Sequence, residues 1–230
     1  MSEEDVTSAL AEAEAPTEAE VAHLLEIVYR HPRHRELYYK ALAFCEGGRT
    51  VDEAEDFIEA QPEYAGALQT STVLVNVLIE EGGLSYEEYD AEGAPLTDER
   101  VATLKDEGVT DDELFDMVAR RMVATTPAGC AAVALLDPKR RVAAYATSVP
   151  ERTRIYRKLL AFCKTPRTLD EIKSLLDGEP ELEASERTAW QKLHASYFID
   201  RMDESGGLAW QGGWVTTEAG EAFLASDDDR

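Results

Sequence analysis

The pattern of apolar and polar positions along the chain repeats with an offset of 118 residues. Residues 32–63 and 150–181 are identical at 13 of 32 positions without a gap, and several other pairs exchange one apolar residue for another. In each stretch, apolar residues at helical spacing follow a proline, which fits the first turn of a helix because its missing N–H has no intrahelical partner there. The repetition predicts two copies of one helical unit.

A second and a third helix are predicted in each copy. Thr50–Glu53 and Thr168–Glu171 are capping boxes, in which Thr and Glu three residues apart satisfy free backbone N–H groups at the start of a helix. A Gln-Pro or Glu-Pro pair then ends that helix. The third helix is expected at residues 66–80 in copy one and at residues 183–200 in copy two.

A hairpin and a last helix complete each predicted copy. Residues 208–216 alternate around a Gly-Gly pair, which is typical of two strands joined by a tight turn. The last helix is expected after Thr216 in copy two and after Thr97 in copy one.

This order of helix, capped helix, helix, hairpin and helix resembles a winged helix-turn-helix domain. The segment Trp214–Leu224 is similar to the strand-to-helix exit of bacterial winged-helix regulators. The resemblance covers both copies and is to the superfamily. It implies a mainly α (α+β) fold, with two winged-helix-like domains that arose by internal duplication. Copy one departs from the pattern, because residues 85–95 replace a short wing and are strongly acidic, which disfavours contact with phosphate.

The predicted organisation has five parts. They are an acidic N-terminal segment with one helix (1–31), winged-helix-like copy one (32–104), a helical connector (105–149), winged-helix-like copy two (150–226) and an acidic tail (227–230). Within the connector, the capping box Thr110–Glu113 opens onto Leu114, Phe115, Val118 and Met122, which predicts one amphipathic helix.

Charge is distributed unevenly along the chain. The sequence has 23 Lys and Arg against 47 Asp and Glu, a formal net charge of −24, and most of the acidity lies in the N-terminal half. Such a chain is repelled by phosphate unless its basic groups cluster. One basic strip stands out: Lys139, Arg140, Arg141, Arg152, Arg154, Arg157 and Lys158. It is either a phosphate-binding strip or an ion-paired seam against the acidic half, within the chain or across a dimer, and the excess of acid favours the seam.

Copy two holds the candidate contact residues for DNA or a partner. In a DNA-binding winged helix the third helix enters the major groove with basic or amide side chains. The candidate helix of copy one has no basic residue, so copy one is not expected to read DNA. Copy two offers Arg187, Trp190, Gln191, Lys192 and His194. Its wing adds Trp210 and Trp214, which are expected to face the same side, either in the core or toward a partner.

No pattern in the sequence predicts catalysis. The chain has no phosphate-binding glycine loop, no GxSxG and no HExxH. Cys45 and Cys163 occupy equivalent places beside a phenylalanine and are interpreted as core, as is Cys130. His31 and His34 form an HxxH pair without a third ligand. We therefore expect no enzymatic activity, no cofactor and no metal.

These observations favour a cytoplasmic interaction module. The apolar stretches are too short to span a bilayer, and the acidic start lacks the basic region of a secretory signal. The chain is similar in layout and acidity to the tandem winged-helix partners of kleisins in chromosome segregation and condensation, which are protein-binding adaptors. The leading hypothesis is a non-catalytic adaptor, in transcription or chromosome-associated regulation, for a protein partner that is basic. The alternatives are a transcriptional regulator that binds DNA through copy two only and, more weakly, a DNA mimic; a homodimer is left open.

Overall fold

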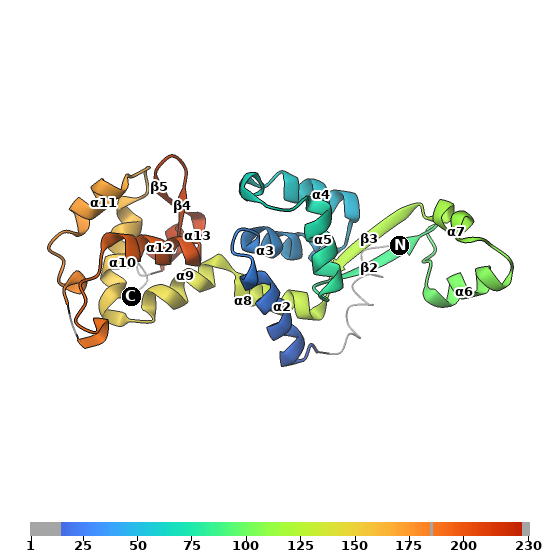
Figure 1. Ribbon diagram of the computed structural model, residues 1–230, viewed down its shortest axis with the longest axis horizontal. Helices are drawn as coiled ribbons and strands as arrows, with labels where there is room; N and C mark the ends of the chain where they lie inside the picture. The colour runs from blue at the N-terminus through green and yellow to red at the C-terminus, as the bar shows by residue number, and fades with distance from the viewer. Residues whose placement is uncertain (1–14, 185, 227–230) are drawn as a thin grey trace. The chain divides into compact units, whose positions relative to one another are not determined.

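The computed structural model describes residues 15–184 and 186–226, and the chain forms two units, residues 1–134 and 135–230. The described part is mainly helical and holds two small antiparallel sheets (Figure 1). This agrees with the mainly α class expected from the sequence. The predicted acidic tail and most of the acidic N-terminal segment before residue 15 lie outside the described residues.

The first unit combines helices with a three-stranded sheet. Its elements are α2 (Glu18–Arg30), α3 (Arg35–Phe44), β1 (Arg49–Thr50), α4 (Val51–Glu59), α5 (Ser71–Glu80), β2 (Leu84–Tyr89), α6 (Asp98–Asp106), α7 (Asp111–Met117), β3 (Arg120–Thr125) and α8 (Pro127–Leu136), with short 3-10 turns at Cys45–Gly47 and Pro62–Gly66. The strand order is β1-β3-β2, and both pairs are antiparallel. The predicted capping boxes at Thr50 and Thr110 are both present.

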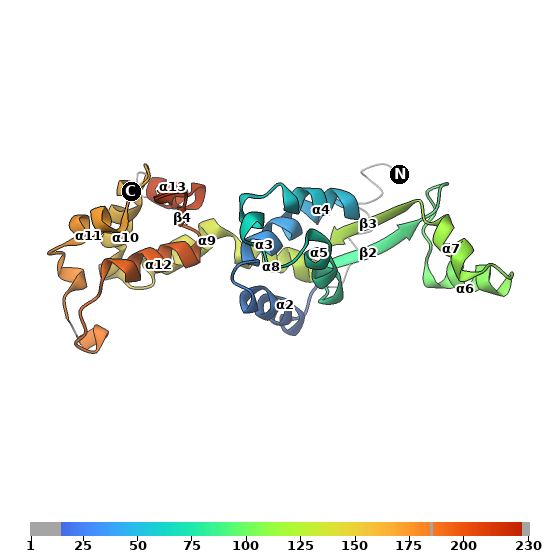
Figure 2. The ribbon, with the colours of Figure 1, turned by 45° about the horizontal axis from the view of Figure 1, so that its top comes forward.

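The prediction of a helical connector over residues 105–149 is wrong in its middle part. The helix that starts after Thr110 ends at Met117, and β3 follows it instead of a continued helix. β3 pairs with β2 from Leu84 opposite Thr125 to Tyr89 opposite Arg120. The two strands form a long ribbon, and α6 and α7 lie at the end of that ribbon away from α3 and α5 (Figure 2).

This pairing also corrects the last helix of copy one. A helix does begin after Thr97, with the Thr97 side chain accepting from the Arg100 N–H, but it belongs to the insertion between β2 and β3. The helix that follows the second strand of the hairpin is α8, from Pro127 to Leu136. The long insertion hid the second strand, because sequence neighbours gave no signal for a partner that lies 30 residues away.

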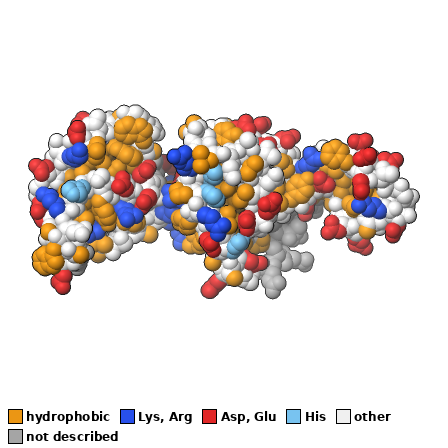
Figure 3. Space-filling model, viewed as in Figure 1, with side chains coloured by type: hydrophobic (Ala, Val, Ile, Leu, Met, Phe, Trp, Pro, Cys, Tyr) orange, Lys and Arg blue, Asp and Glu red, His pale blue; other side chains and the backbone are white. Residues whose placement is uncertain are grey.

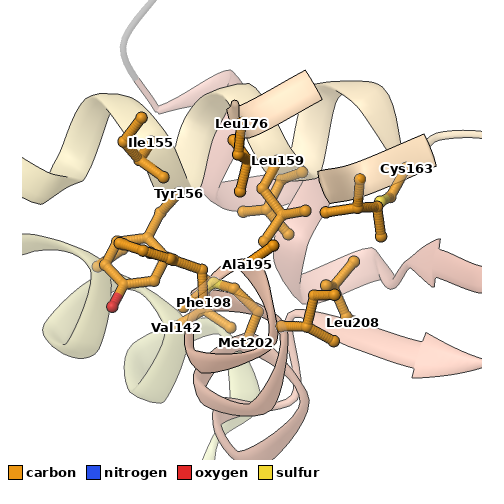
Figure 4. Packing of buried hydrophobic residues seen from close by; sticks show 14 of the residues in the cluster. Val142, Ile155, Tyr156, Leu159, Cys163, Leu176, Ala195, Phe198, Met202 and Leu208 are labelled. Atoms are coloured by element: carbon orange, nitrogen blue, oxygen red, sulfur yellow. The ribbon is translucent and has the colours of Figure 1, made fainter. Parts of the chain in front are cut away.

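The second unit has a similar series of elements in fewer residues. They are α9 (Pro138–Thr147), α10 (Pro150–Phe162), α11 (Leu169–Leu176), α12 (Ala195–Ser205), β4 (Leu208–Trp210), β5 (Trp214–Thr216) and α13 (Glu218–Ala225), with 3-10 turns at Pro180–Leu182 and Glu186–Thr188. β4 and β5 form an antiparallel hairpin. Its core gathers fully buried side chains from several helices, among them Tyr156, Leu159, Phe198 and Met202 (Figure 4).

The third helix of each copy is shorter than predicted. In the first unit it starts at Ser71 instead of residue 66, and in the second it starts at Ala195 instead of residue 183 and runs to Ser205. In the second unit, residues 186–194 form a largely irregular segment with one 3-10 turn, Glu186–Thr188, and the Leu193 N–H donates to the Leu182 carbonyl at 2.8 Å. This hydrogen bond holds the buried Leu182 beside Leu193, two residues before α12.

In each unit, one threonine holds the end of the hairpin against a helix, α3 in the first unit and α10 in the second. Thr125 Oγ1 donates to the Leu42 carbonyl at 2.5 Å, and Thr216 Oγ1 donates to the Leu160 carbonyl at 2.6 Å. Leu42 and Leu160 are 118 residues apart, which is the offset found in the sequence. All four residues are buried and cannot reach water, so each hydrogen bond satisfies a hydroxyl and a carbonyl that would otherwise have no partner.

A glycine after each threonine permits close packing of backbone on backbone. A Cβ at Gly129 would lie 2.3 Å from the Gly83 carbonyl oxygen, and a Cβ at Gly220 would lie 2.5 Å from that of Gly207. Only glycine fits at either position without a shift of the backbone. The same combination of a buried threonine and a closely packed glycine therefore packs the hairpin and the last helix together in both units.

None of the helices within residues 15–184 and 186–226 combines the length and the hydrophobicity that a bilayer crossing requires.

Candidate interaction surface on the second unit

The hairpin of the second unit presents its two tryptophans on one side. Trp210 and Trp214 are paired across β4 and β5, and their rings meet edge to face with centroids 5.4 Å apart. The prediction that they share a side is confirmed. Trp214 is half-buried against the core, whereas Trp210 is 59% exposed. Hydrophobic side chains gather over this part of the second unit in the view of Figure 3.

The hairpin is fixed to the loop before α11. Trp214 and Arg167 exchange two backbone hydrogen bonds, at 2.8 and 3.1 Å, and the first unit pairs Val123 with Arg49 in the same way. The exposed Trp210 ring thus rests against Trp214, whose strand β5 is paired with β4 on one side and with Arg167 on the other. A large aromatic side chain on a rigid support is typical of residues that dominate the binding energy of protein interfaces.

The predicted contact residues of the third helix do not lie on a helix face. Trp190, Gln191 and Lys192 belong to the irregular segment before α12, and His194 is the residue that precedes the helix. Arg187 lies in the short 3-10 turn, and its side chain is outside the described part. The expectation of one helix-borne contact set is therefore wrong.

The surface of α12 itself is acidic. Its exposed positions include Asp200, Asp203 and Glu204, and Arg201 donates to Glu204 at 2.5 Å. Lys192, before the helix, pairs with Glu183 at 3.0 Å. An acidic helix face is repelled by the phosphates that line a major groove, so this helix is poorly suited to read DNA.

Trp190 stands out in that segment. It is 74% exposed, and both Trp190 and Ala189 adopt positive φ angles, 61° and 51°. Non-glycine residues in this conformation are strained, and such strain concentrates at sites of function. The second unit therefore exposes a second large aromatic side chain apart from the hairpin.

The basic strip is largely neutralised within the second unit. Arg154 donates two hydrogen bonds to Glu181, at 2.9 and 2.8 Å, and a third to Glu179, which also pairs with Lys158. These contacts hold the pKa of Glu179 below its usual range. The seam interpretation is therefore supported for these residues, but the carboxylates come from the same unit and not from the acidic N-terminal half.

The remaining basic residues of the strip are dispersed. Lys139 pairs with Glu218 at 2.7 Å, and Arg140 and Arg141 on α9 also have partners. Arg157 donates to the Phe223 carbonyl at 3.1 Å and lies over its ring. The strip therefore does not form one continuous cationic surface.

Arg152, the remaining residue of the strip, contacts a cluster of tyrosines that the sequence did not predict. It donates to the Tyr197 hydroxyl at 3.1 Å and lies over that ring, and Arg201 lies over the rings of both Tyr197 and Tyr145. Burial acts to raise the pKa of Tyr197, but the hydrogen bond from Tyr145 and the two arginine charges together lower it. The arginines bridge α9, α10 and α12 by cation–π contact.

An open hollow of about 520 Å³ lies between the end of α10 and the exposed side of α11. It is lined by Phe162, Thr168, Asp170, Glu171, Ser174 and Leu175. Arg167, which pairs with the hairpin, also lies over the Phe162 ring at 4.3 Å. Arg167 therefore contacts both the tryptophan hairpin and a ring that lines the hollow. Sequence reasoning missed this site, although Leu175 occupies the position in the repeat that corresponds to Phe57 of the first unit.

Cys45, Cys163 and His34 lie in the cores of their units, whereas Cys130 on α8 is exposed, so the interpretation of Cys130 as a core residue is wrong. Cys45 and Cys163 are fully buried, and burial raises the pKa of each thiol to about 11, so neither is an activated nucleophile. His34 is buried and its Nε2 accepts the Leu68 N–H at 3.0 Å. Within the ranges that the structure describes, no group of three or more His, Cys, Asp or Glu side chains is placed to hold a metal ion.

Comparison of the chain with protein-family models, with curated proteins and with solved structures gave no match.

Proposed function

We propose that this chain is a non-catalytic adaptor, built from two winged-helix-like domains that arose by duplication, and that its second unit binds a basic protein partner. The recurrence of the same threonine, glycine and backbone contacts in both units supports the duplication. The helix–helix–helix–hairpin–helix order of each unit supports the winged-helix assignment.

The observation that carries the proposal is the exposed aromatic surface of the second unit. Trp210 lies beside Trp214 on a hairpin paired with Arg167, and the same arginine lies over the ring of Phe162, which lines the hollow. An exposed apolar patch with a polar rim marks an interaction site in soluble proteins. Tryptophan and arginine are also the residues most enriched where interface energy concentrates.

The charge of the chain supports a basic partner. Residues 1–134 contain 9 Lys and Arg against 30 Asp and Glu, whereas residues 135–230 contain 14 against 17. The exposed face of α5 carries Asn76 and the acidic Glu80, and the helix contains no basic residue. An acidic chain attracts a basic partner over a distance of about 10 Å at moderate salt and raises the rate of encounter.

The proposal is tested by site-specific photo-cross-linking in cells that make the protein. A photoreactive phenylalanine analogue replaces Trp210 in one full-length version and Asp200, on the acidic face of α12, in a matched control. We expect the Trp210 position to capture one protein, with an excess of Lys and Arg, that the Asp200 position does not capture. The captured protein, once purified, should bind the wild type about tenfold more tightly than Trp210→Ala.

A DNA-binding experiment checks the regulator hypothesis on the same samples. Binding to mixed-sequence duplex DNA is followed by fluorescence anisotropy over a salt series, with wild type and an Arg187→Ala/Lys192→Ala variant. We expect no binding at moderate salt in either. Tight binding with a steep salt dependence that the variant loses, together with equal cross-linking at both positions, would overturn the adaptor function.

A further inference from the structure

Corresponding phenylalanines have different surroundings in the two units. In the first unit, Phe44 at the end of α3 is covered by Phe57 of α4, whose ring lies parallel to it with centroids 4.1 Å apart. Arg49 lies over the same Phe44 ring at 4.8 Å. The first unit therefore supplies both an aromatic and a cationic neighbour to this ring from its own chain.

The second unit keeps the cation but lacks the ring. Phe162 corresponds to Phe44, and Arg167 lies over it at 4.3 Å, as Arg49 lies over Phe44. The residue that corresponds to Phe57 is Leu175, 118 positions later. The smaller Leu175 side chain leaves the hollow beside Phe162, whose lining includes both residues.

The remaining lining of the hollow is polar and acidic. Asp170 and Glu171 line it, and the Asp170 side chain is 90% exposed in spite of its contact with Lys173. Glu171 accepts from the Thr168 N–H at 2.8 Å, and its carboxylate is also about half exposed. The site therefore combines an unfilled aromatic floor with carboxylates that face solvent, which suits an aromatic side chain flanked by cations.

The chain outside the described residues has no aromatic side chain to offer. Residues 1–14 and 227–230 contain no Phe, Tyr or Trp, and neither does position 185. None of these residues can therefore supply the ring that would complete the stack.

We propose that the hollow binds an aromatic side chain from a basic segment of a partner protein, stacked on Phe162 as Phe57 is stacked on Phe44. This inference rests on the adaptor function and specifies the chemistry of the partner. Because the first unit already contains such a stack between Phe44 and Phe57, a single substitution can give either unit the arrangement found in the other. Leu175→Phe fills the hollow, and Phe57→Leu opens the corresponding place in the first unit.

The experiment is an NMR titration of the full chain with acetyl-Lys-Lys-Phe-Lys-Lys-amide. The control peptide has Ala in place of Phe and the same charge, so that the difference between the two peptides isolates the ring. For the wild type we expect the Phe peptide to bind about tenfold more tightly and to shift the methyl signals of Leu175. Leu175→Phe should remove that difference, and Phe57→Leu should add a second site for the Phe peptide.

Several results would overturn the inference. One is an equal affinity of the two peptides, since attraction to acid alone would then account for binding. Another is retention of the full preference by Leu175→Phe, which is expected to fold because Leu175 borders an open hollow. Self-association of the wild type that Leu175→Phe abolishes would make a second copy the occupant and would also overturn it. If cross-linking at Trp210 captures a partner while the peptide preference is absent, the adaptor function stands and only the aromatic-docking inference fails.

Discussion

Replacing Gly220 with Ala would disturb the contact that closes the second unit. The new Cβ would lie 2.5 Å from the Gly207 carbonyl oxygen, 2.7 Å from Thr216 Cγ2 and 3.0 Å from Leu160 Cδ2. Favourable contacts of carbon lie at about 3.5–4.0 Å, so the backbone and both side chains must move by roughly 1 Å. The Gly207 carbonyl also accepts the Thr217 N–H at 3.1 Å, and this hydrogen bond would be strained by the movement.

The cost can be estimated from these contacts. Overpacking a well-packed site costs about 1–3 kcal/mol, and a weakened hydrogen bond adds about 1 kcal/mol. Alanine in a helix recovers about 1 kcal/mol relative to glycine. The net loss for Gly220→Ala is therefore about 1–3 kcal/mol. With a urea dependence of about 2 kcal/mol per molar for a unit of this size, the unfolding midpoint should fall by about 0.5–1.5 M.

Tryptophan fluorescence gives a specific assay for this unit. All three tryptophans, Trp190, Trp210 and Trp214, lie in residues 135–230. Urea unfolding of the full chain followed by their emission therefore reports the second unit directly. Far-UV circular dichroism of Gly129→Ala should show the corresponding loss in the first unit, because a Cβ at Gly129 would lie 2.3 Å from the Gly83 oxygen.

Gly66→Ala is the matched control for Gly129→Ala, because both glycines lie in the first unit. A Cβ at Gly66 meets nothing within 4 Å, and its φ is compatible with alanine. This change should be neutral or stabilise by about 0.5 kcal/mol, since alanine restricts the unfolded chain. A midpoint shift below about 0.5 M for Gly220→Ala would show that the site relaxes freely and would refute the close-packing argument.

Three further outcomes follow from charge and burial. Because burial lowers the pKa of His34, the neutral form is favoured in the fold; its contribution is present above about pH 6.5 and is lost as the pH falls through the lowered value. His34→Gln should therefore reduce the loss of stability between pH 7 and 5 in urea titrations, and an unchanged pH slope would contradict this. Replacing Glu179 and Glu181 with Gln should release the basic residues they neutralise and steepen the salt dependence of binding to heparin or duplex DNA by about one unit per freed cation; an unchanged slope would show that the pairs do not compensate. A thiol reagent should modify only Cys130 in the native protein, since the other two cysteines are buried, and all three after unfolding; rapid modification of a second thiol would contradict that burial.

The sequence predicted those elements whose signals are local. The capping boxes at Thr50, Thr110 and Thr168 all start helices, and the alternation at residues 208–216 forms the hairpin. The third helix of copy two was wrongly predicted to start at residue 183, because the hydrogen bond from the Leu193 N–H to the Leu182 carbonyl, which closes a loop before α12, has no local signal in the sequence. Positive φ angles at two non-glycine residues within that loop have no sequence signature.

Long-range pairing accounts for the other main error. Residues between β2 and β3 include two capped helices, which were predicted as the last helix of copy one and the start of the connector. Only the pairing of β2 with β3 shows that they form an insertion. The candidate surface was recovered in part for a related reason. Alternation predicted that Trp210 and Trp214 share a face. The hollow at Phe162 arises because Leu175 replaces the larger Phe57 of the first unit, and the space that this exchange leaves can be recognised only in the folded structure.

The differences between the two units indicate where function resides. Buried threonines and close glycines recur because any change there would open the fold. The units differ at three places that do not close a core: the long acidic insertion between β2 and β3, the strained segment that carries Trp190, and the exchange of Phe57 for Leu175. Each difference changes a surface and leaves the framework intact. The first unit covers its own phenylalanine and gains acidity, whereas the second leaves Phe162 open beside an exposed tryptophan hairpin. A division of this kind is expected of an adaptor in which one unit attracts a basic partner and the other binds it.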